Sequence, residues 1–252
     1  MEILSTISFL VRPTTLNLPP TFTHGLLLGF LAIKFILLLI LESYCANEVR
    51  VLLGRKGGKS LYLAAIWANL RNDVLIGPPM YHVVVTYICT QGPLTRAEQA
   101  RSVMGILVVE GLLFFWIHRA FHKVRGLWWM HRFHHKFNDV VLPSSANAVS
   151  TAEFVFAYMI PILIGATIMN ADIYSTLCAT YIIQITNLFI HTPFLEGHWP
   201  SSKQNKSFPG WVFVGTSDHL HHHRHMTAHY SAPVFHFDRV LDGSKTESGK
   251  QK

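Results

Sequence analysis

The chain has 252 residues, half of them hydrophobic and only 14% charged. Soluble domains usually carry about a quarter charged residues, so the composition excludes an ordinary soluble domain and predicts an integral membrane protein. The formal net charge of +7 is interpreted as contact between loops and anionic lipid, and no nucleic-acid partner is expected. The length is typical of one domain, and three scattered cysteines favour neither disulfides nor a zinc–thiolate site.

The first apolar run covers residues 25–41 and is long enough to cross a bilayer with its flanks. Its one charged residue, Lys34, is interpreted as a packing or snorkelling lysine. The basic loop at 44–60 is expected on the cytosolic side, by the positive-inside rule. Residues 61–90 predict an amphipathic helix that continues into a bent crossing near 74–90.

A further crossing is predicted over residues 102–117, after a capping-box pattern at 95–98. The long apolar run at 152–190 is interrupted by polar residues at 170–172, which predicts a transmembrane hairpin. A hairpin returns to the side that it left, so it brings its two flanks together. The lysine-rich tail at 243–252 is predicted to be disordered.

Three histidine boxes stand out against this background, with the patterns HxxxH, HxxHH and HxxHH. Residues three or four apart share one face of a helix, and neutral imidazole is the commonest protein metal ligand. Eight imidazoles exceed the roughly four ligands that one tetrahedral metal needs, so two metal ions are predicted. Three boxes of matched spacing favour a metal site over a tag or a low-complexity tract. The predicted ligands from the boxes are His118, His122, His131, His134, His135, His219, His222 and His223.

Over residues 105–242 the chain resembles the fatty acid hydroxylase / sterol desaturase superfamily of membrane di-iron enzymes, and most closely its C-4 methylsterol oxidase branch. The resemblance rests on the aromatic run 115–122 into the first box, the nine-residue step to the second, and the stretch 215–230 with the Asp-Arg pair at 238–239. It implies an all-α bundle of about four to five transmembrane helices, with a cytosolic histidine-rich cap that holds the dimetal site. The whole chain, 1–252, is then one membrane oxygenase domain.

The resemblance also implies a further ligand shortly after the hairpin, where we favour His191 over the later His198. Glu110 and Glu153 are the acidic residues nearest the boxes, and each either orients an imidazole or is a polar residue at a helix end. The candidates for outer contacts or extra ligands are His198, His221, Glu110, Glu153, Tyr230 and Asp238.

Three positions depart from the family pattern. Gly111 stands where an acidic residue is common, Ser150 where a histidine is common, and His229 where an asparagine is common. These departures leave the substrate open and suggest a specialised member, for example in secondary metabolism.

By this resemblance the chain is an O2-dependent, non-heme enzyme of the endoplasmic reticulum membrane with two iron ions. It would hydroxylate, or oxidise in several steps, an aliphatic carbon of a sterol, a terpenoid or another lipophilic substrate drawn from membrane lipid. The sequence has no recognisable flavin or nicotinamide site, so electrons are expected from a cytochrome b5-type protein or a reductase on the cytosolic face. Two alternatives are a desaturase with the same site and a non-enzymatic protein that handles metal. A transporter would place ligands mid-membrane, whereas these boxes flank the apolar runs, which favours the enzyme.

Overall fold

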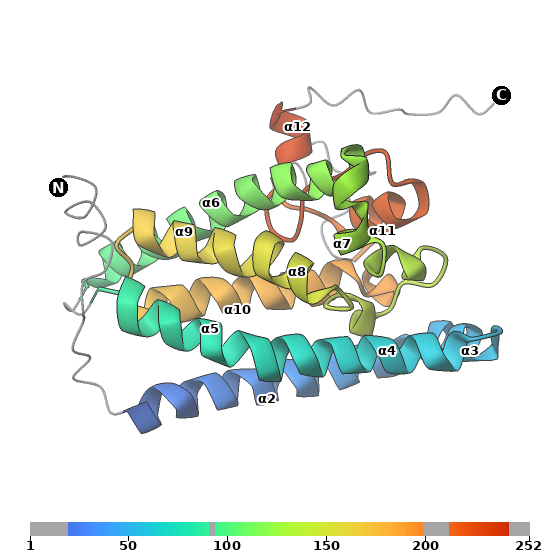
Figure 1. Ribbon diagram of the computed structural model, residues 1–252, viewed down its shortest axis with the longest axis horizontal. Helices are drawn as coiled ribbons and strands as arrows, with labels where there is room; N and C mark the ends of the chain where they lie inside the picture. The colour runs from blue at the N-terminus through green and yellow to red at the C-terminus, as the bar shows by residue number, and fades with distance from the viewer. Residues whose placement is uncertain (1–19, 91–93, 199–211, 242–252) are drawn as a thin grey trace.

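The computed structural model describes residues 20–90, 94–198 and 212–241, which form helices joined by turns, with one isolated β-bridge between Phe213 and Phe235. The longer helices lie roughly side by side in an elongated bundle (Figure 1). The predicted disordered tail at 243–252 lies outside the described residues. In chain order the α-helices are α2 (Pro20–Tyr44), α3 (Ala46–Gly54), α4 (Gly58–Leu70), α5 (Gly77–Val83), α6 (Arg96–Lys123), α7 (Trp128–His131), α8 (Thr151–Glu153), α9 (Ile160–Ile168), α10 (Ile173–Ile190), α11 (Thr216–His225) and α12 (Phe237–Leu241).

Shorter helical turns of other types connect these helices. The π-helical turns are η1 (Arg71–Ile76), η2 (Val84–Ile88) and η6 (Phe154–Met159). The 3₁₀ turns are η3 (Arg125–Leu127), η4 (His134–Phe137), η5 (Pro143–Ser145) and η7 (Pro193–Leu195).

Within the described residues, four helical segments are long and apolar enough to cross a membrane. They are Gly25–Tyr44, Arg96–Lys123, Thr151–Ile168 and Ile173–Ile190. This confirms the all-α membrane fold, at the lower end of the predicted number of crossings. The bent crossing predicted near 74–90 is helical but is not among the four. It is bent as expected, since π-helical turns flank the short α5, and Pro78 and Pro79 stand at its start.

The predicted hairpin forms, with its turn at the polar residues before α10. Asp172 caps α10, because its Oδ1 accepts the Ser175 N–H at 2.7 Å. The predicted capping box of α6 also forms, since Glu98 Oε2 accepts the Thr95 N–H at 2.8 Å. Gly165 lets α9 approach α6 closely, because a Cβ there would stand 3.1 Å from the Ile106 Cα.

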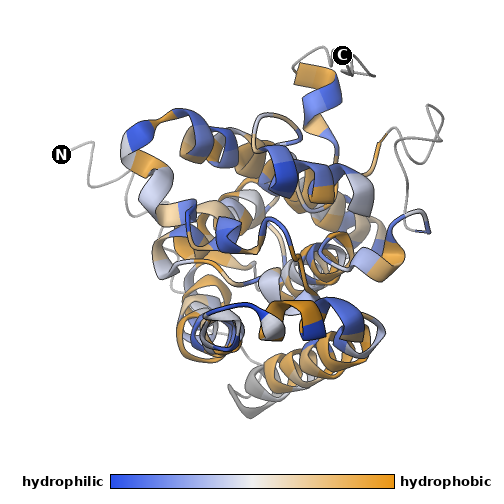
Figure 2. Ribbon diagram, turned by 90° about the vertical axis from the view of Figure 1, so that its right-hand side faces the viewer, coloured by the Kyte–Doolittle hydropathy of each residue, from blue (hydrophilic) through white to orange (hydrophobic). Residues whose placement is uncertain are grey.

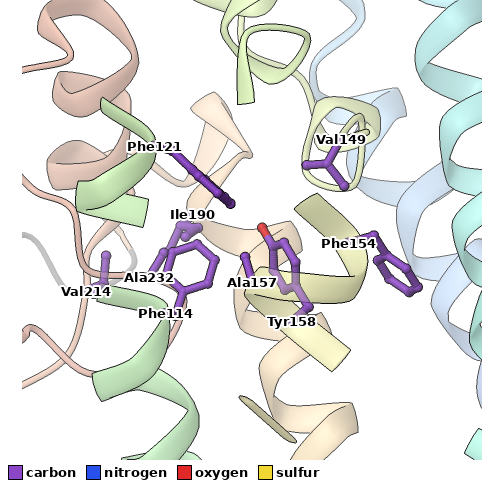
Figure 3. Packing of buried hydrophobic residues seen from close by; sticks show 9 residues of the cluster. All are labelled: Phe114, Phe121, Val149, Phe154, Ala157, Tyr158, Ile190, Val214 and Ala232. Atoms are coloured by element: carbon purple, nitrogen blue, oxygen red, sulfur yellow. The ribbon is translucent and has the colours of Figure 1, made fainter. Parts of the chain in front are cut away.

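A buried apolar cluster lies beneath the histidines and joins α6 to the hairpin (Figure 3). The Phe114 ring is 5.1 Å from the ring of His118 and 5.2 Å from that of Tyr158. The whole cluster consists of Phe114, Phe121, Val149, Phe154, Ala157, Tyr158, Ile190, Val214 and Ala232. These side chains give the histidine region an apolar border on the side of Phe114.

Lys34 does not snorkel, contrary to one of the two roles expected for it. Its ammonium forms an ion pair with Asp73 of η1, and the two side chains are 3% and 0% exposed. Asn147 donates a hydrogen bond to the other carboxylate oxygen of Asp73 at 2.8 Å. The backbone N–H of Ser144 donates to Glu42 Oε2 of α2 at 3.1 Å. The loop after the second box is therefore buried and fixed to the first helices.

The histidine boxes lie at the end of the bundle where α7 and α11 are found (Figure 1). Viewed from that end, hydrophilic residues gather on several of the nearer segments, and the long helices behind them are largely hydrophobic (Figure 2). The site therefore stands at a polar end of an apolar bundle.

Candidate metal centre

Five elements deliver the predicted ligands to one place. His118 and His122 occupy the last turns of α6, and His191 directly follows α10 as its C-cap. The second box spans α7 and η4, and the third lies on α11. The hairpin explains the meeting, because it returns the chain to the end that α6 reaches.

The first cluster consists of His118, His122, His131, His135 and His222. Their Nε2 atoms converge. His131 Nε2 is 2.9 Å from His118 Nε2 and 2.9 Å from His135 Nε2. His122 Nε2 lies 3.3 Å from His118 Nε2. In each pair the rings cross steeply rather than stacking, so that ring nitrogens and not ring faces meet.

The second cluster consists of His134, His191, His219 and His223, all buried. His191 is at its centre. Its Nε2 atom lies 2.8 Å from His219 Nε2 and 3.4 Å from the Nε2 atoms of both His134 and His223. One ligand atom from each of the four histidines falls within 4.8 Å of all the others.

Two of the boxes are divided between the clusters, and this was not predicted. In the third box His222 joins the first cluster, whereas His219 and His223 join the second. Consecutive residues on a helix are about 100° apart, so His222 and His223 point to different places. In the second box His134 separates from its neighbours, because the α-helix ends at His131 and a 3₁₀ turn begins at His134.

The outward ring nitrogens of the first cluster are held by acceptors. The Nδ1 atom of His118 donates to the Tyr230 carbonyl at 2.7 Å, and that of His222 donates to the Ala228 carbonyl at 2.8 Å. His131 Nδ1 lies 2.6 Å from Glu153 Oε1. Each contact places the proton on Nδ1 and leaves the Nε2 lone pair pointing inward, which is the tautomer that binds metal.

This arrangement fits metal ions. His118 and His131 both donate their Nδ1 proton to an outer acceptor. Their Nε2 atoms therefore carry no hydrogen, although they lie 2.9 Å apart. Two facing lone pairs repel unless a cation stands between them. Nitrogen ligands bound at about 2.0–2.1 Å to one tetrahedral, zinc-sized ion are separated by about 3.3 Å, close to the 2.9–3.3 Å between these atoms. The two clusters thus have the donor set and the spacing for two metal ions.

The protonation states agree with this interpretation. Burial lowers the pKa of His135 and of His191 to about 4. Burial, followed by neighbouring imidazoles, holds the pKa of His134, His219 and His223 well below 6.5. These side chains are therefore neutral near pH 7, which is the form that donates a lone pair to a metal.

Three of the predicted outer residues, Glu153, Tyr230 and Asp238, contact or support ligand histidines, whereas Glu110 does not. Glu153 contacts His131, and Tyr230 accepts from His118 through its backbone carbonyl, not its hydroxyl. Asp238 accepts the Tyr230 N–H at 2.8 Å and so holds that carbonyl's segment in place. Glu110 is fully buried in α6 and, among the described residues, its carboxylate has no hydrogen-bond partner.

His198 and His221 lie outside both clusters, so the structure does not bring them to the site as the sequence suggested. His198 is exposed beyond η7, and its ring stacks on Phe194. His221 is exposed on α11 against His225. His221 points away because it is out of phase with the ligand face of α11. His198 points away because it lies well past the end of α10.

Two site residues were missed in the sequence. Asn138 Oδ1 accepts from His135 Nδ1 at 2.7 Å, and the Asn187 carbonyl accepts from His191 Nδ1 at 2.7 Å. The signal for Asn138 was its position three residues after His135. Asn187 acts through its backbone, four residues before His191, which side-chain patterns do not show.

Comparisons with known proteins agree with this geometry. The fatty acid hydroxylase family model matches residues 103–243, which include both clusters. Fatty acid hydroxylase ahd1 of Mycosarcoma maydis is 29% identical over 140 residues, which is 56% of this chain and 32% of that protein. The chain therefore spans about a third of that relative's length. No solved structure matches.

Proposed function

Because the chain belongs to the fatty acid hydroxylase family, we propose that it is a multi-pass membrane oxidoreductase that hydroxylates an aliphatic carbon of a lipophilic substrate with two bound metal ions. The observation that carries the proposal is the gathering of nine imidazoles into two buried clusters at one end of an apolar bundle. Bound there, a pair of redox metal ions supplies dioxygen-dependent oxidation of a C–H bond.

Iron is the metal proposed for both clusters. Imidazole ligands suit zinc, copper and nickel as well as iron, so the donor atoms alone do not select it. Iron is favoured because the family's name describes hydroxylation, which needs a metal that changes oxidation state, whereas zinc has no redox chemistry. The electrons are proposed to come from an external donor, since the sequence has no recognisable flavin or nicotinamide motif.

The substrate is proposed to arrive from the bilayer, along a series of cavities between α2 and α10. A groove of about 610 Å³ opens between these helices, with Phe30 and Leu177 in its lining. The same two residues line a smaller cavity that continues inward past Ile162 and Gln184. A further cavity shares those inner residues and reaches Asn187, whose carbonyl holds His191.

Residues around the histidine clusters, at the inner end of the path, exclude water and hold the ligand rings in place. The apolar cluster around Phe114 and Tyr158 excludes water beneath the first cluster. Glu153 holds the ring of His131, and the Tyr230 carbonyl holds that of His118. Rings fixed from outside keep their inward nitrogens in place without reorganisation during turnover. Because the path begins at a groove on the lipid-facing surface, the proposed substrate is a sterol, a terpenoid or another bulky lipid.

The electron donor is proposed to dock beside the boxes on the cytosolic face of the endoplasmic reticulum membrane. Exposed basic residues surround the second box, among them Arg125, Arg132 and Lys136. Excess basic charge is typical of the cytosolic side, and it would attract an acidic partner such as a cytochrome b5-type protein.

The test is metal analysis and turnover on the detergent-purified full chain. We expect about two iron ions per chain, lipid-dependent O2 uptake with a reductant, and a product about 16 Da heavier than the substrate. A product 2 Da lighter than the substrate would indicate desaturation in place of hydroxylation. Iron-loaded protein that consumes no O2 with a panel of sterols, terpenoids and fatty acids and its donor present would favour the metal-handling alternative. His225→Ala, an exposed histidine of α11 outside both clusters, is the matched control.

A further inference from the structure

A third group of ligand-type side chains lies in the C-terminal segment, apart from the two clusters. Asp218 comes from the first turn of α11, His229 from the stretch that follows the helix, and His236 from the residue before α12. One ligand atom from each lies within 4.8 Å of the others. His236 Nε2 is 3.6 Å from Asp218 Oδ2, and His229 Nδ1 is 3.9 Å from Asp218 Oδ1.

The protein does not satisfy these imidazoles by itself. The side chain of His236 is 1% exposed, and neither of its ring nitrogens has a hydrogen-bond partner among the described residues. His229 Nδ1 is likewise buried without one. Buried polar atoms are almost always hydrogen-bonded, and leaving one unpaired costs about 1–3 kcal/mol. Two of these nitrogens, His236 Nε2 and His229 Nδ1, face the Asp218 carboxylate, and together they point to a ligand.

The charges around the group favour a positive ligand. Asp238 is 3.7 Å from His236 Nδ1, but its two oxygens accept the backbone N–H groups of Tyr230 and Ser231. Arg239 lies 3.9 Å from Asp218 Oδ2 and is the one feature that opposes a cation. Two carboxylates and one guanidinium thus border the group, a set of contacts that suits a cation better than an anion.

The distances argue against direct hydrogen bonds between the His236 ring and the two carboxylates. A protonated imidazole between two carboxylates makes short charge-assisted hydrogen bonds, at about 2.7–2.9 Å. Here the gaps on the two sides of the ring are 3.6 and 3.7 Å. Ligands of one zinc-sized ion stand about 3.3 Å apart or slightly more, which is closer to what is observed.

We infer that Asp218, His229 and His236 bind a third divalent metal ion, with zinc as the ion that this donor set suits. Two imidazoles and one carboxylate are an established zinc ligand set, and they leave a coordination position for water. His229, whose side chain is 29% exposed, is the most exposed of the three residues. His229 has a left-handed backbone with φ of +58°, uncommon for a residue other than glycine, and this fixes the direction of its ring.

The third ion would brace the helix that carries the third box. Asp218 immediately precedes His219 of the second cluster, and His229 immediately precedes Tyr230, whose carbonyl holds His118. A metal that joins them would tie α11 to the segment that leads into α12. This site is independent of the proposed function, since it needs neither iron nor turnover.

The test is zinc content of the full chain, measured by mass spectrometry of the metals after dialysis at pH 7. His236→Gln and His229→Asn should each hold one zinc equivalent fewer than wild type, and re-adding zinc should raise the unfolding temperature of wild type but not of either variant. The matched control is His225→Gln, which changes an exposed imidazole of α11 outside all three groups and should match wild type.

Equal metal content in wild type and both variants would overturn the site. Wild-type protein provides a readout that no folding defect can affect. After both clusters are filled with iron, it should take up one further equivalent of zinc, and uptake of none would equally overturn the proposal.

Discussion

Glu153 Oε1 lies 2.6 Å from His131 Nδ1, and both side chains are about 1% exposed. A carboxylate behind a ligand imidazole fixes its tautomer and raises its basicity. The residue is therefore part of the metal centre although it does not reach the metal position itself. Its place at the start of the hairpin links the second box to the membrane helices.

Glu153→Ala is expected to weaken metal binding by about 10–100-fold, because the His131 ring loses the carboxylate that holds its Nδ1 atom. Glu153→Gln should weaken it less, since the amide oxygen still accepts the Nδ1 proton. Competition with a chelator measures both. Glu196→Ala, at an exposed glutamate, is the control, and unchanged affinity in Glu153→Ala would refute the role.

His222→Ala and His223→Ala are expected to affect different metal ions although the residues are adjacent. His222 belongs to the first cluster and His223 to the second. Each variant should lose about one equivalent of metal and all turnover, as should His134→Ala. Spectroscopy of the remaining iron should give different signals for the two variants. Identical signals, or full turnover in any of the three variants, would contradict the assignment.

Metal-free protein is expected to lose stability as the pH falls from about 6.5 to 4. Burial lowers the pKa of His135 and His191 from 6.5 to about 4. The unfolded chain then binds more protons than the folded one in this window, so stability is complete above 6.5 and is lost as the pH falls through 4. Thermal unfolding of chelator-treated protein measures it. The His135→Gln, His191→Gln double variant should show a flatter profile, and an equally steep one would argue against these groups.

Lys34→Met is expected to destabilise the fold by about 3–5 kcal/mol, because it leaves Asp73 buried without its cation. The double variant Lys34→Met, Asp73→Leu should recover most of that loss. Lys59→Met, at an exposed lysine of α4, should change stability by less than about 0.5 kcal/mol. Denaturant titration in detergent compares the three, and a harmless Lys34→Met would show that the pair is not needed.

Ile162→Trp is expected to obstruct the proposed substrate path. Ile162 lines both inner cavities, so a larger ring there fills the space between the groove and Asn187. Turnover of bulky lipids should fall at least tenfold with metal content unchanged. Leu163→Trp on the neighbouring position of α9, which lines neither cavity, is the control. Equal turnover in the two variants would place the path elsewhere.

The sequence by itself determined the helices and the ligand types. Crossings of membrane length follow from runs of apolar residues, and the hairpin follows from one polar break near Asp172, because local composition controls both. The three boxes were visible for the same reason. The ion pair of Lys34 was not predicted because its partner, Asp73, is 39 residues away, and no local pattern pairs them.

Only the tertiary structure decided how the histidines are distributed. A box predicts neighbours on one helix, but a cluster forms where rings from several helices converge. His134 belongs to a different cluster from His131 and His135 because the α-helix ends before it. His222 and His223 belong to different clusters because consecutive residues of a helix point about 100° apart. The meeting of His229 and His236 with Asp218 likewise depends on how the chain returns after α11, which no spacing in the sequence specifies.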